Sequence, residues 1–416
     1  MKNTLEHISF RTNWRLSEKT ANLLGQCYAY INSILNTPIR PDYYQKLLLV
    51  SLNKGALATT AIEGNTLTEA DLAQIQSGRD LEPSKRYQQQ EVKNILAAFN
   101  TILEELVRKK SPEIISPGLI RRFNKMVGEH IGEAFGGHPG QFRRRNVVVG
   151  AYRPPSFEKV EGLVQKLCDW LIQDFHCMRR TEGSETNTLP KQQPALQGEV
   201  VDYKQEQTFD KAVLEAIVTH VYIAWIHPFL DGNGRTARLL EFYLLMRAGI
   251  PSIASHILSN HYNDTRTRYY RELQNASETG NLSAFIEYAL EGFRDGLEKI
   301  IEILHRDGTE ITWNNYVNNF IEKMQDEGKT KNALRRLRQL AYYIPADRFC
   351  RIDEIKILNT KIAEAYGKLN QITLRRDLDL LVEKNLLKAE KNTYRAHYEL
   401  LRDFLPEASI PIKRHY

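Results

Sequence analysis

The chain has 416 residues, and 42% of them are hydrophobic, which is enough for two or three domains with separate cores. Lys plus Arg number 57 against 51 Asp plus Glu, an excess that fits nucleotide or nucleic-acid partners but establishes neither. The first residues, MKNTLEHISFRTNWRL, lack the apolar core of a signal peptide, and no apolar run approaches the ~20 residues that cross a bilayer. We therefore expect a cytoplasmic protein with no membrane partner.

The cysteines indicate neither a zinc site nor a disulfide framework. None of them forms a CxxC pair, so we expect reduced thiols. They are Cys27, Cys168, Cys177 and Cys350.

The first block, residues 1–110, is predicted to be helical. From Ser17 to about Val107 the apolar residues recur at helical spacing, and Pro38 and Pro41 mark a turn.

The second block, residues 111–308, begins with helix and then breaks. Gly136–Gly140 interrupts the pattern, and Arg145–Gly150 is typical of a short strand or hairpin arm. Helix resumes near Phe157. Residues 179–207 are polar and rich in Thr, Gln and Glu, so we expect an inserted surface loop without a catalytic role.

The most hydrophobic helix is predicted over Ala212–Ile226, which is apolar on nearly every face and therefore belongs at the centre of a helical bundle. A polar loop follows Pro228, and a second apolar helix is predicted from near Arg235 until Gly249 ends it. The loop is thus expected between two buried helices.

This loop has the features of a phosphate cradle. Free N–H groups and the positive dipole end at a helix N-terminus attract anions, and Gly232 and Gly234 allow close backbone approach. Arg235 and Arg238 are three apart, so both can reach phosphate oxygens from one helix face.

Two further residues in the loop complete a set of reactive groups. Asp231 offers the oxygen ligand that Mg²⁺ prefers, and His227 is the one loop group that can take a proton near neutral pH. Each residue alone is more often structural. Their occurrence together within twelve residues favours a functional site.

The segment HPFLDGNGRTAR, residues 227–238, resembles the signature of the Fic family, HPFx(D/E)GNGRxxR, without a mismatch. Upstream, GQFRRRNVVVG with Tyr152 and Pro154-Pro155 resembles the family's flap hairpin, which binds a target segment by strand addition. The resemblance covers roughly Ser17 to Leu304. It implies a mainly α fold: a Fic-type helical bundle with a short β-hairpin flap.

The resemblance implies a nucleotidyltransferase that moves AMP from ATP onto a Ser, Thr or Tyr hydroxyl of a target protein. His227 would be the general base, and Asp231 would hold Mg²⁺. Some members with lysine at the position of Gly234 transfer phosphate instead, so Gly234 favours adenylylation.

The remaining roles that the resemblance implies concern the nucleotide. Asn233 and the N–H groups around Gly232 and Gly234 would stabilise the α-phosphate. Arg235 and Arg238 would hold the outer phosphates. The two residues expected to border the nucleotide are Asn263 and Tyr270.

A second motif, Thr59–Gly64, resembles the (S/T)xxxE(G/N) inhibitory helix of the family. Thr59 and Glu63 are four apart and share a helix face, and Gly64 can close the helix in a left-handed conformation. The next helix is predicted to start at a capping box, Thr66–Glu69. By resemblance, Glu63 pairs with Arg238 and keeps the enzyme inactive.

The third block, residues 309–416, is predicted to hold a C-terminal winged-helix (α+β) domain. Leu369–Leu378 leads into Asp379–Lys388, with an arginine pair at Arg375 and Arg376, and Lys388–Tyr398 is the expected wing. Residues 331–390 contain 13 Lys plus Arg against 8 Asp plus Glu. The acidic Asp377, Asp379 and Glu383 dilute this basic character.

Two hypotheses of different classes follow. As an enzyme, the chain takes ATP and Mg²⁺ and modifies a target protein at the flap. As a regulator, it binds DNA through the C-terminal block. Removal of AMP by the same site, and a homodimer, are also left open by the sequence.

Overall fold

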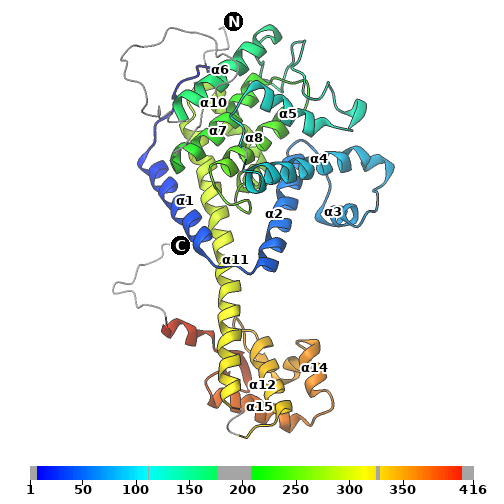
Figure 1. Ribbon diagram of the computed structural model, residues 1–416, viewed down its shortest axis with the longest axis vertical. Coiled ribbons are helices and arrows are strands. Elements are labelled where there is room, and N and C mark those ends of the chain that lie inside the picture. The colour runs from blue at the N-terminus through cyan, green and yellow to red at the C-terminus, as the bar shows by residue number, and fades with distance from the viewer. Residues whose placement is uncertain (1–6, 111, 176–207, 325–327, 405–416) are drawn as a thin grey trace. The chain divides into compact units, whose positions relative to one another are not determined.

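The structure is a computed structural model that describes residues 7–110, 112–175, 208–324 and 328–404. It divides the chain into two compact units, Met1–Ile301 and Glu302–Tyr416, and both are mainly helical (Figure 1). Residues of the first predicted block lie in the same unit as the second block. The insertion predicted at residues 179–207 lies outside the described residues.

The first unit is built from helices whose bounds follow from local signals. Ser17 caps one helix by accepting from Thr20 N at 3.1 Å, and Ser116 caps another by accepting from Leu119 N at 3.1 Å. The helices are α1 (Glu18–Asn36), α2 (Pro41–Ala61), α3 (Glu69–Gln76), η1 (Pro83–Lys85), α4 (Arg86–Leu103), η2 (Glu104–Arg108), α5 (Pro117–Gly128), η3 (Gly132–Ala134), α6 (Phe157–Phe175), α7 (Phe209–Ile226), α8 (Asn233–Arg247), α9 (Ile257–Asp264), α10 (Arg266–Thr279) and the first part of α11 (Ser283–Lys323).

The pair α7 and α8 forms the centre of this unit (Figure 1). Almost every residue of α7 is buried, as its uniformly apolar sequence predicted, and α8 is buried along most of its length. Helices α2, α4 and α5 pack on α8, while α6 packs on α7. The loop between α7 and α8 is therefore held between two buried helices. In the described part of the chain, no helix has the length and apolarity needed to cross a membrane.

Two local predictions need correction. The capping box is formed by Thr68 and Asp71, with Thr68 Oγ1 accepting from Asp71 N at 3.2 Å, and not by Thr66 and Glu69. Thr66 is engaged elsewhere, because its hydroxyl donates to Gln88 Oε1 at 3.1 Å.

The segment 145–150 is also not a regular strand. Among the described residues its pairing is a single antiparallel bridge, in which Val149 and Tyr152 exchange two backbone hydrogen bonds of 2.9 Å across a turn at Gly150, whose φ is 59°. A short hairpin tip is thus present, but the expected arm is irregular.

The second unit combines helices with a small antiparallel sheet. Its strands lie in the order β1-β3-β2, with Cys350 opposite Tyr394 and Leu387 opposite Ala396. The segment predicted as the wing, Lys388–Tyr398, contains most of β2 and all of β3. The elements are the second part of α11, α12 (Lys331–Tyr343), β1 (Cys350–Arg351), α13 (Ile352–Ile355), α14 (Thr360–Tyr366), α15 (Gln371–Glu383), β2 (Leu387–Glu390), β3 (Thr393–Ala396) and η4 (Tyr398–Phe404).

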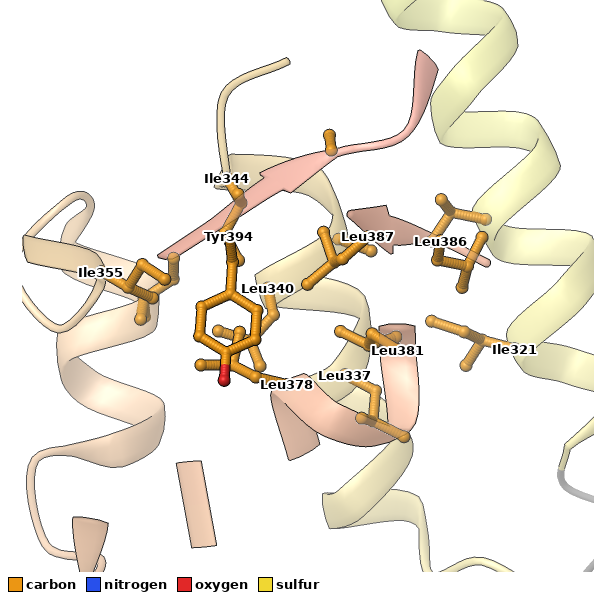
Figure 2. Packing of buried hydrophobic residues seen from close by; sticks show 14 of the residues in the cluster. Ile321, Leu337, Leu340, Ile344, Ile355, Leu378, Leu381, Leu386, Leu387 and Tyr394 are labelled. Carbon is orange, nitrogen blue, oxygen red and sulfur yellow. The ribbon is translucent and has the colours of Figure 1, made fainter. Parts of the chain in front are cut away.

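One apolar core holds this unit together (Figure 2). Leu337 and Leu340 of α12 face Leu378 and Leu381 of α15, and the ring of Tyr394 from β3 closes the cluster. These leucines recur three apart on their helices and are each at most 1% exposed, which is the pattern of an amphipathic helix packed on one face. The opposite face of α15 is left to solvent.

Candidate active site

The site begins where α7 ends. His227 adopts a left-handed conformation with φ 50° and ψ 59°, and its N–H donates to Ile223 O at 2.9 Å. The residue before a proline avoids the helical region, so Pro228 ends the helix here. A left-handed conformation costs a non-glycine residue roughly 1–2 kcal/mol, and the surrounding contacts must offset this.

The loop that follows is braced by side-chain amides. Asn233 closes it on itself: its Oδ1 accepts from Phe229 N, and its Nδ2 donates to Phe229 O, both at 2.9 Å. From α5, Asn124 donates to Asp231 O at 3.1 Å. Gly232 caps α8 with φ 77°, a conformation that glycine adopts at no steric cost. The Asn233 amide therefore shapes the cradle, and the contact with the α-phosphate that the resemblance implied stays a prediction.

The first N–H groups of α8 have no partner within the helix, and they open onto Glu63. A Cβ at Gly234 would collide with Glu63 Oε1, so the carboxylate lies directly against the start of α8. An anion of the protein itself thus sits where the helix N-terminus attracts anions.

Glu63 also forms an ion pair with Arg238. Glu63 Oε1 accepts from Arg238 Nη2 at 2.6 Å, and the same nitrogen donates to Thr59 O at 2.9 Å. Glu63 lies just beyond the end of α2, where Gly64 has φ 100°. The pair that the resemblance implied is thus present, although it uses the backbone of Thr59 and not its hydroxyl.

The charges of this pair stabilise each other. Burial raises the pKa of the Glu63 carboxyl, but Arg238 and Arg235 outweigh it and hold that pKa below its usual value. Burial lowers the pKa of Arg238, whereas Glu63 raises it, and the net pKa lies above its usual value. Arg238 is 1% exposed, and within the described residues its Nε and Nη1 atoms have no hydrogen-bond partner. These two nitrogen atoms can therefore donate hydrogen bonds to a ligand.

Arg235, one turn earlier, has different partners. It forms ion pairs with Glu91 of α4 and, at 2.7 Å, with Asp231 Oδ1. Glu91 also accepts from Asn65 Nδ2 at 2.9 Å. The two arginines that the sequence placed on one helix face are therefore both engaged with carboxylates from the surrounding helices and loop.

Asp231 presents a carboxylate at the rim of the loop. Its Oδ1 accepts from Gly232 N at 2.5 Å, and its Oδ2 accepts from Gly136 N at 3.2 Å. The side chain is 32% exposed. No group of three or more His, Cys, Asp or Glu residues that could hold a metal occurs in the described part of the chain. One exposed carboxylate fits Mg²⁺, which is commonly held by one or two carboxylates plus substrate phosphates.

His227 is neutral at neutral pH. Burial lowers the pKa of its imidazole to about 4, and Arg143 acts in the same direction, while Glu63 and Asp231 oppose it. Its Nδ1 lies 3.4 Å from Ala224 O. The tautomer that makes this contact leaves Nε2 free to accept a proton.

The two residues expected near the nucleotide lie on different helices. Tyr270 of α10 is 46% exposed and donates to Ile62 O at 3.1 Å, so it contacts the turn that carries Glu63. Asn263 is half-buried on α9.

Sequence reasoning missed three contributors to the site: Glu91, Asn124 and Arg143. They lie 144, 107 and 84 positions from their partners in the motif, and no spacing pattern links residues so far apart.

Comparison with known proteins agrees with this geometry. Residues 114–245 match the model of the Fic/DOC family. The chain is therefore similar to Fic-domain proteins in this region. It is 28% identical over 254 residues to protein adenylyltransferase fic-1 of Caenorhabditis elegans, covering 61% of this chain and 42% of that protein. It is 30% identical over 246 residues to protein adenylyltransferase Fic of Drosophila ananassae, covering 59% of this chain and 40% of that protein. The chain thus spans about two fifths of the length of these relatives.

Solved structures share the fold. A Fic family protein from Desulfovibrio desulfuricans aligns with a TM-score of 0.52 at 17% identity, covering 93% of this chain and 98% of that chain. Fic-1 of C. elegans aligns with a TM-score of 0.52 at 22% identity, covering 69% of this chain and 73% of that chain. At these identities the likeness concerns the fold alone.

Proposed function

We propose that this chain transfers AMP from ATP to a Ser, Thr or Tyr hydroxyl of a target protein. The observation that carries the proposal is the joint placement of a neutral His227, the start of α8, and two unpartnered donor atoms of buried Arg238. The relatives named protein adenylyltransferases support the same reaction.

In the proposed reaction, His227 Nε2 accepts the proton of the target hydroxyl as its oxygen bonds to the α-phosphorus of ATP. The bond from that phosphorus to the bridging oxygen breaks, and pyrophosphate leaves. The N–H groups at the start of α8 stabilise the charge that develops on the α-phosphate. Arg238 binds the outer phosphates, and Asn233 keeps the loop in shape.

Asp231 would hold Mg²⁺ together with the phosphates of ATP, because its carboxylate is partly exposed at the loop rim. When bound, the ion neutralises phosphate charge and favours departure of pyrophosphate. Arg235 keeps the Asp231 carboxylate oriented through their 2.7 Å contact.

The contact between Glu63 and Arg238 would inhibit the enzyme at rest. The carboxylate occupies the anion position against Gly234 and pairs with the arginine proposed to bind the outer phosphates. ATP then lacks a partner for its γ-phosphate and binds unproductively. Movement of the turn at residues 62–64 would release Arg238.

The target would dock at the flap by strand addition. Val148 and Val149 are 64% and 42% exposed, and among the described residues the backbone of this segment has one bridge partner, Tyr152. The backbone groups of the exposed Val148 would pair with a target strand.

Mass spectrometry of the full chain with ATP and Mg²⁺ tests the proposal. Glu63→Gly is expected to gain AMP on itself and to label proteins in a lysate, whereas Glu63→Gly with His227→Ala gains none. A gain of phosphate in place of AMP, or equal labelling in the His227→Ala variant, would contradict it. If AMP-labelled chain loses AMP when incubated with the wild type, the site also catalyses removal.

We propose DNA binding through the second unit as a second function, since the order of its elements matches a winged helix. The first half of α15 presents Ile372, 73% exposed, together with the exposed Arg375 and Arg376. Arg375 Nη2 donates to Asn392 Oδ1 at 3.1 Å in the turn between β2 and β3, which would place helix and wing on one surface.

One acidic residue that counted against DNA binding is absent from this surface. Asp377 is 4% exposed, accepts from Arg336 and Tyr366, and lies 3.7 Å from Arg376 Nη2, so it is buried beneath the basic face and pairs with one of its arginines. DNA binding should fall steeply with salt, and Arg375→Gln with Arg376→Gln should abolish it. Equal retention of DNA by this variant and by the wild type would contradict the second function.

A further inference from the structure

Arg143 connects the catalytic loop to the segment that precedes the proposed target site. The residue is 3% exposed. Its Nε donates to His227 O at 2.8 Å, its Nη1 to Arg145 O at 3.1 Å, and its Nη2 to Pro155 O. Its backbone N–H donates to Pro228 O at 2.9 Å. One side chain thus binds carbonyls of three separate stretches of backbone.

Two of these contacts fix the turn at the catalytic histidine. His227 has a left-handed backbone, which is unfavourable for a residue with a side chain. Arg143 binds the carbonyl groups of both His227 and Pro228, and so holds the two peptide planes that follow the His227 Cα. The direction of the imidazole depends on those planes.

The other two contacts fix the outer part of the flap, residues 145–155, which follows Arg143. Arg145 O and Pro155 O lie at its two ends, and the same guanidinium binds both. Tyr152, from its tip, donates to Trp225 O at 2.8 Å. The flap is therefore attached at both ends and at its tip to the last turn of α7 and the residue after it.

The charge of Arg143 also acts on His227. In the described part of the chain Arg143 forms hydrogen bonds to carbonyls and no ion pair with a carboxylate. The charged groups that act on His227 are Arg143 from the segment before the flap, Glu63 beyond α2, and Asp231 in its own loop. Arg143 is the one among these three that opposes protonation of the imidazole. The carboxylate of Glu158 acts on Arg143 through its charge without forming an ion pair. Burying a cation without a paired carboxylate is costly, and a neutral donor would satisfy a purely structural role.

We propose that Arg143 is a positioning residue for the transfer reaction: it fixes the His227 imidazole relative to the flap. This inference rests on the proposed function. Arg143 does not touch the reacting atoms in this account; it sets the distance between the base and a hydroxyl presented on a strand added to the flap.

Arg143→Gln and Arg143→Lys separate the two effects, with Arg144→Gln as the control because Arg144 is exposed. All three are made in the Glu63→Gly chain. Misplacing the base by about 1 Å lowers kcat about a hundredfold, and we expect this for both Arg143 variants, with the affinity for a non-hydrolysable ATP analogue unchanged. Arg143→Gln removes a positive charge that opposes protonation of His227, so the acid limb of its pH–rate profile should move to higher pH. Arg143→Lys keeps the charge, and its acid limb should stay in place.

A second readout does not depend on activity. The protonation of the His227 imidazole can be followed by NMR of histidine-labelled protein, with the signal assigned by its loss in His227→Gln. The pH midpoint of this titration should shift upward in Arg143→Gln and stay in place in Arg144→Gln.

Two outcomes would overturn the inference. In the first, Arg143→Gln and Arg144→Gln show equal rates and equal titration midpoints. In the second, Arg143→Gln loses ATP affinity in step with its rate while the titration midpoint is unchanged. If no chain transfers AMP but the titration still shifts, the proposed reaction fails and the coupling between Arg143 and His227 stands. Should Arg143→Gln not fold, a hundredfold loss in Arg143→Lys supports the inference, and a rate equal to the control overturns it.

Discussion

Arg235 and Arg238 lie one turn apart on the same helix, yet their carboxylate partners differ in kind. Glu91 projects from the middle of α4, is 12% exposed, and also accepts from Asn65. Glu63 lies beyond the end of α2, and its side chain is 33% exposed. Glu91 is therefore held by a helix, whereas Glu63 lies on a turn.

This difference indicates two functions for two similar ion pairs. Removing Glu91 would require movement of α4, which packs on α8 and α5. Removing Glu63 requires movement of a turn only, and Gly64 within it has open space around its Cα. We infer that Glu91 supports the loop, and that Glu63 acts as a gate that controls access of phosphate to Arg238.

Glu63→Gln should raise self-modification the most. The glutamine keeps the size of the side chain but removes the charge that competes with phosphate. A hydrogen bond to a charged group contributes about 1.5–3 kcal/mol, so the initial rate should rise roughly ten- to a hundredfold. Labelling with α-³²P ATP measures it, with His227→Ala as the blank. Equal rates for this variant and the wild type would show that Glu63 is not the gate.

The loop and the contact between Glu63 and Arg238 could be predicted from sequence because their residues are contiguous or match a spaced motif. His227–Arg238 contains the proposed base, the cradle and both arginines, and Glu63 precedes a glycine that closes a helix. The apolar sequence of α7 likewise specified a central helix.

The supporting contacts could not be predicted, because they depend on tertiary packing. Glu91 is an ordinary polar residue of an amphipathic helix until α4 packs beside α8. The misplaced capping box has the same cause: Thr66 and Thr68 both fit the pattern, and the contact of Thr66 with Gln88 on another helix decides between them.

Glu91→Gln should lower stability and should not activate. Arg235 is 5% exposed, and it would keep only Asp231 as a charged partner. Breaking a buried ion pair costs about 3–5 kcal/mol. Because Asp231 remains, we expect the low end of this range and a fall in Tm of roughly 5 °C. Calorimetry of the full chain measures the change, and Glu63→Gln is the matched control with a smaller shift. Activation by Glu91→Gln as large as that of Glu63→Gln would remove the contrast.

Tyr270→Phe should loosen the gate slightly. The variant loses the 3.1 Å hydrogen bond from the tyrosine hydroxyl to Ile62 O, and a neutral hydrogen bond contributes about 1 kcal/mol. The self-modification rate should therefore rise about fivefold in the wild type and stay unchanged in Glu63→Gln, where the gate is already open. If Tyr270 instead borders the nucleotide, its removal raises the KM for ATP in both backgrounds.

Mild acid should have the smallest effect, because both ionised partners of the gate persist. The pKa of Glu63 lies below its ordinary value of 4.5 in the folded chain. The stabilisation from its pair with Arg238 is therefore fully present above pH 4.5 and is lost only as pH falls through the lower folded value. His227, with a pKa of about 4, is also neutral down to pH 5.5. We expect the ratio of the Glu63→Gln rate to the wild-type rate to stay within about twofold between pH 7 and 5.5. A ratio that approaches one across this range would mean that a group other than the Glu63 carboxylate controls access to Arg238.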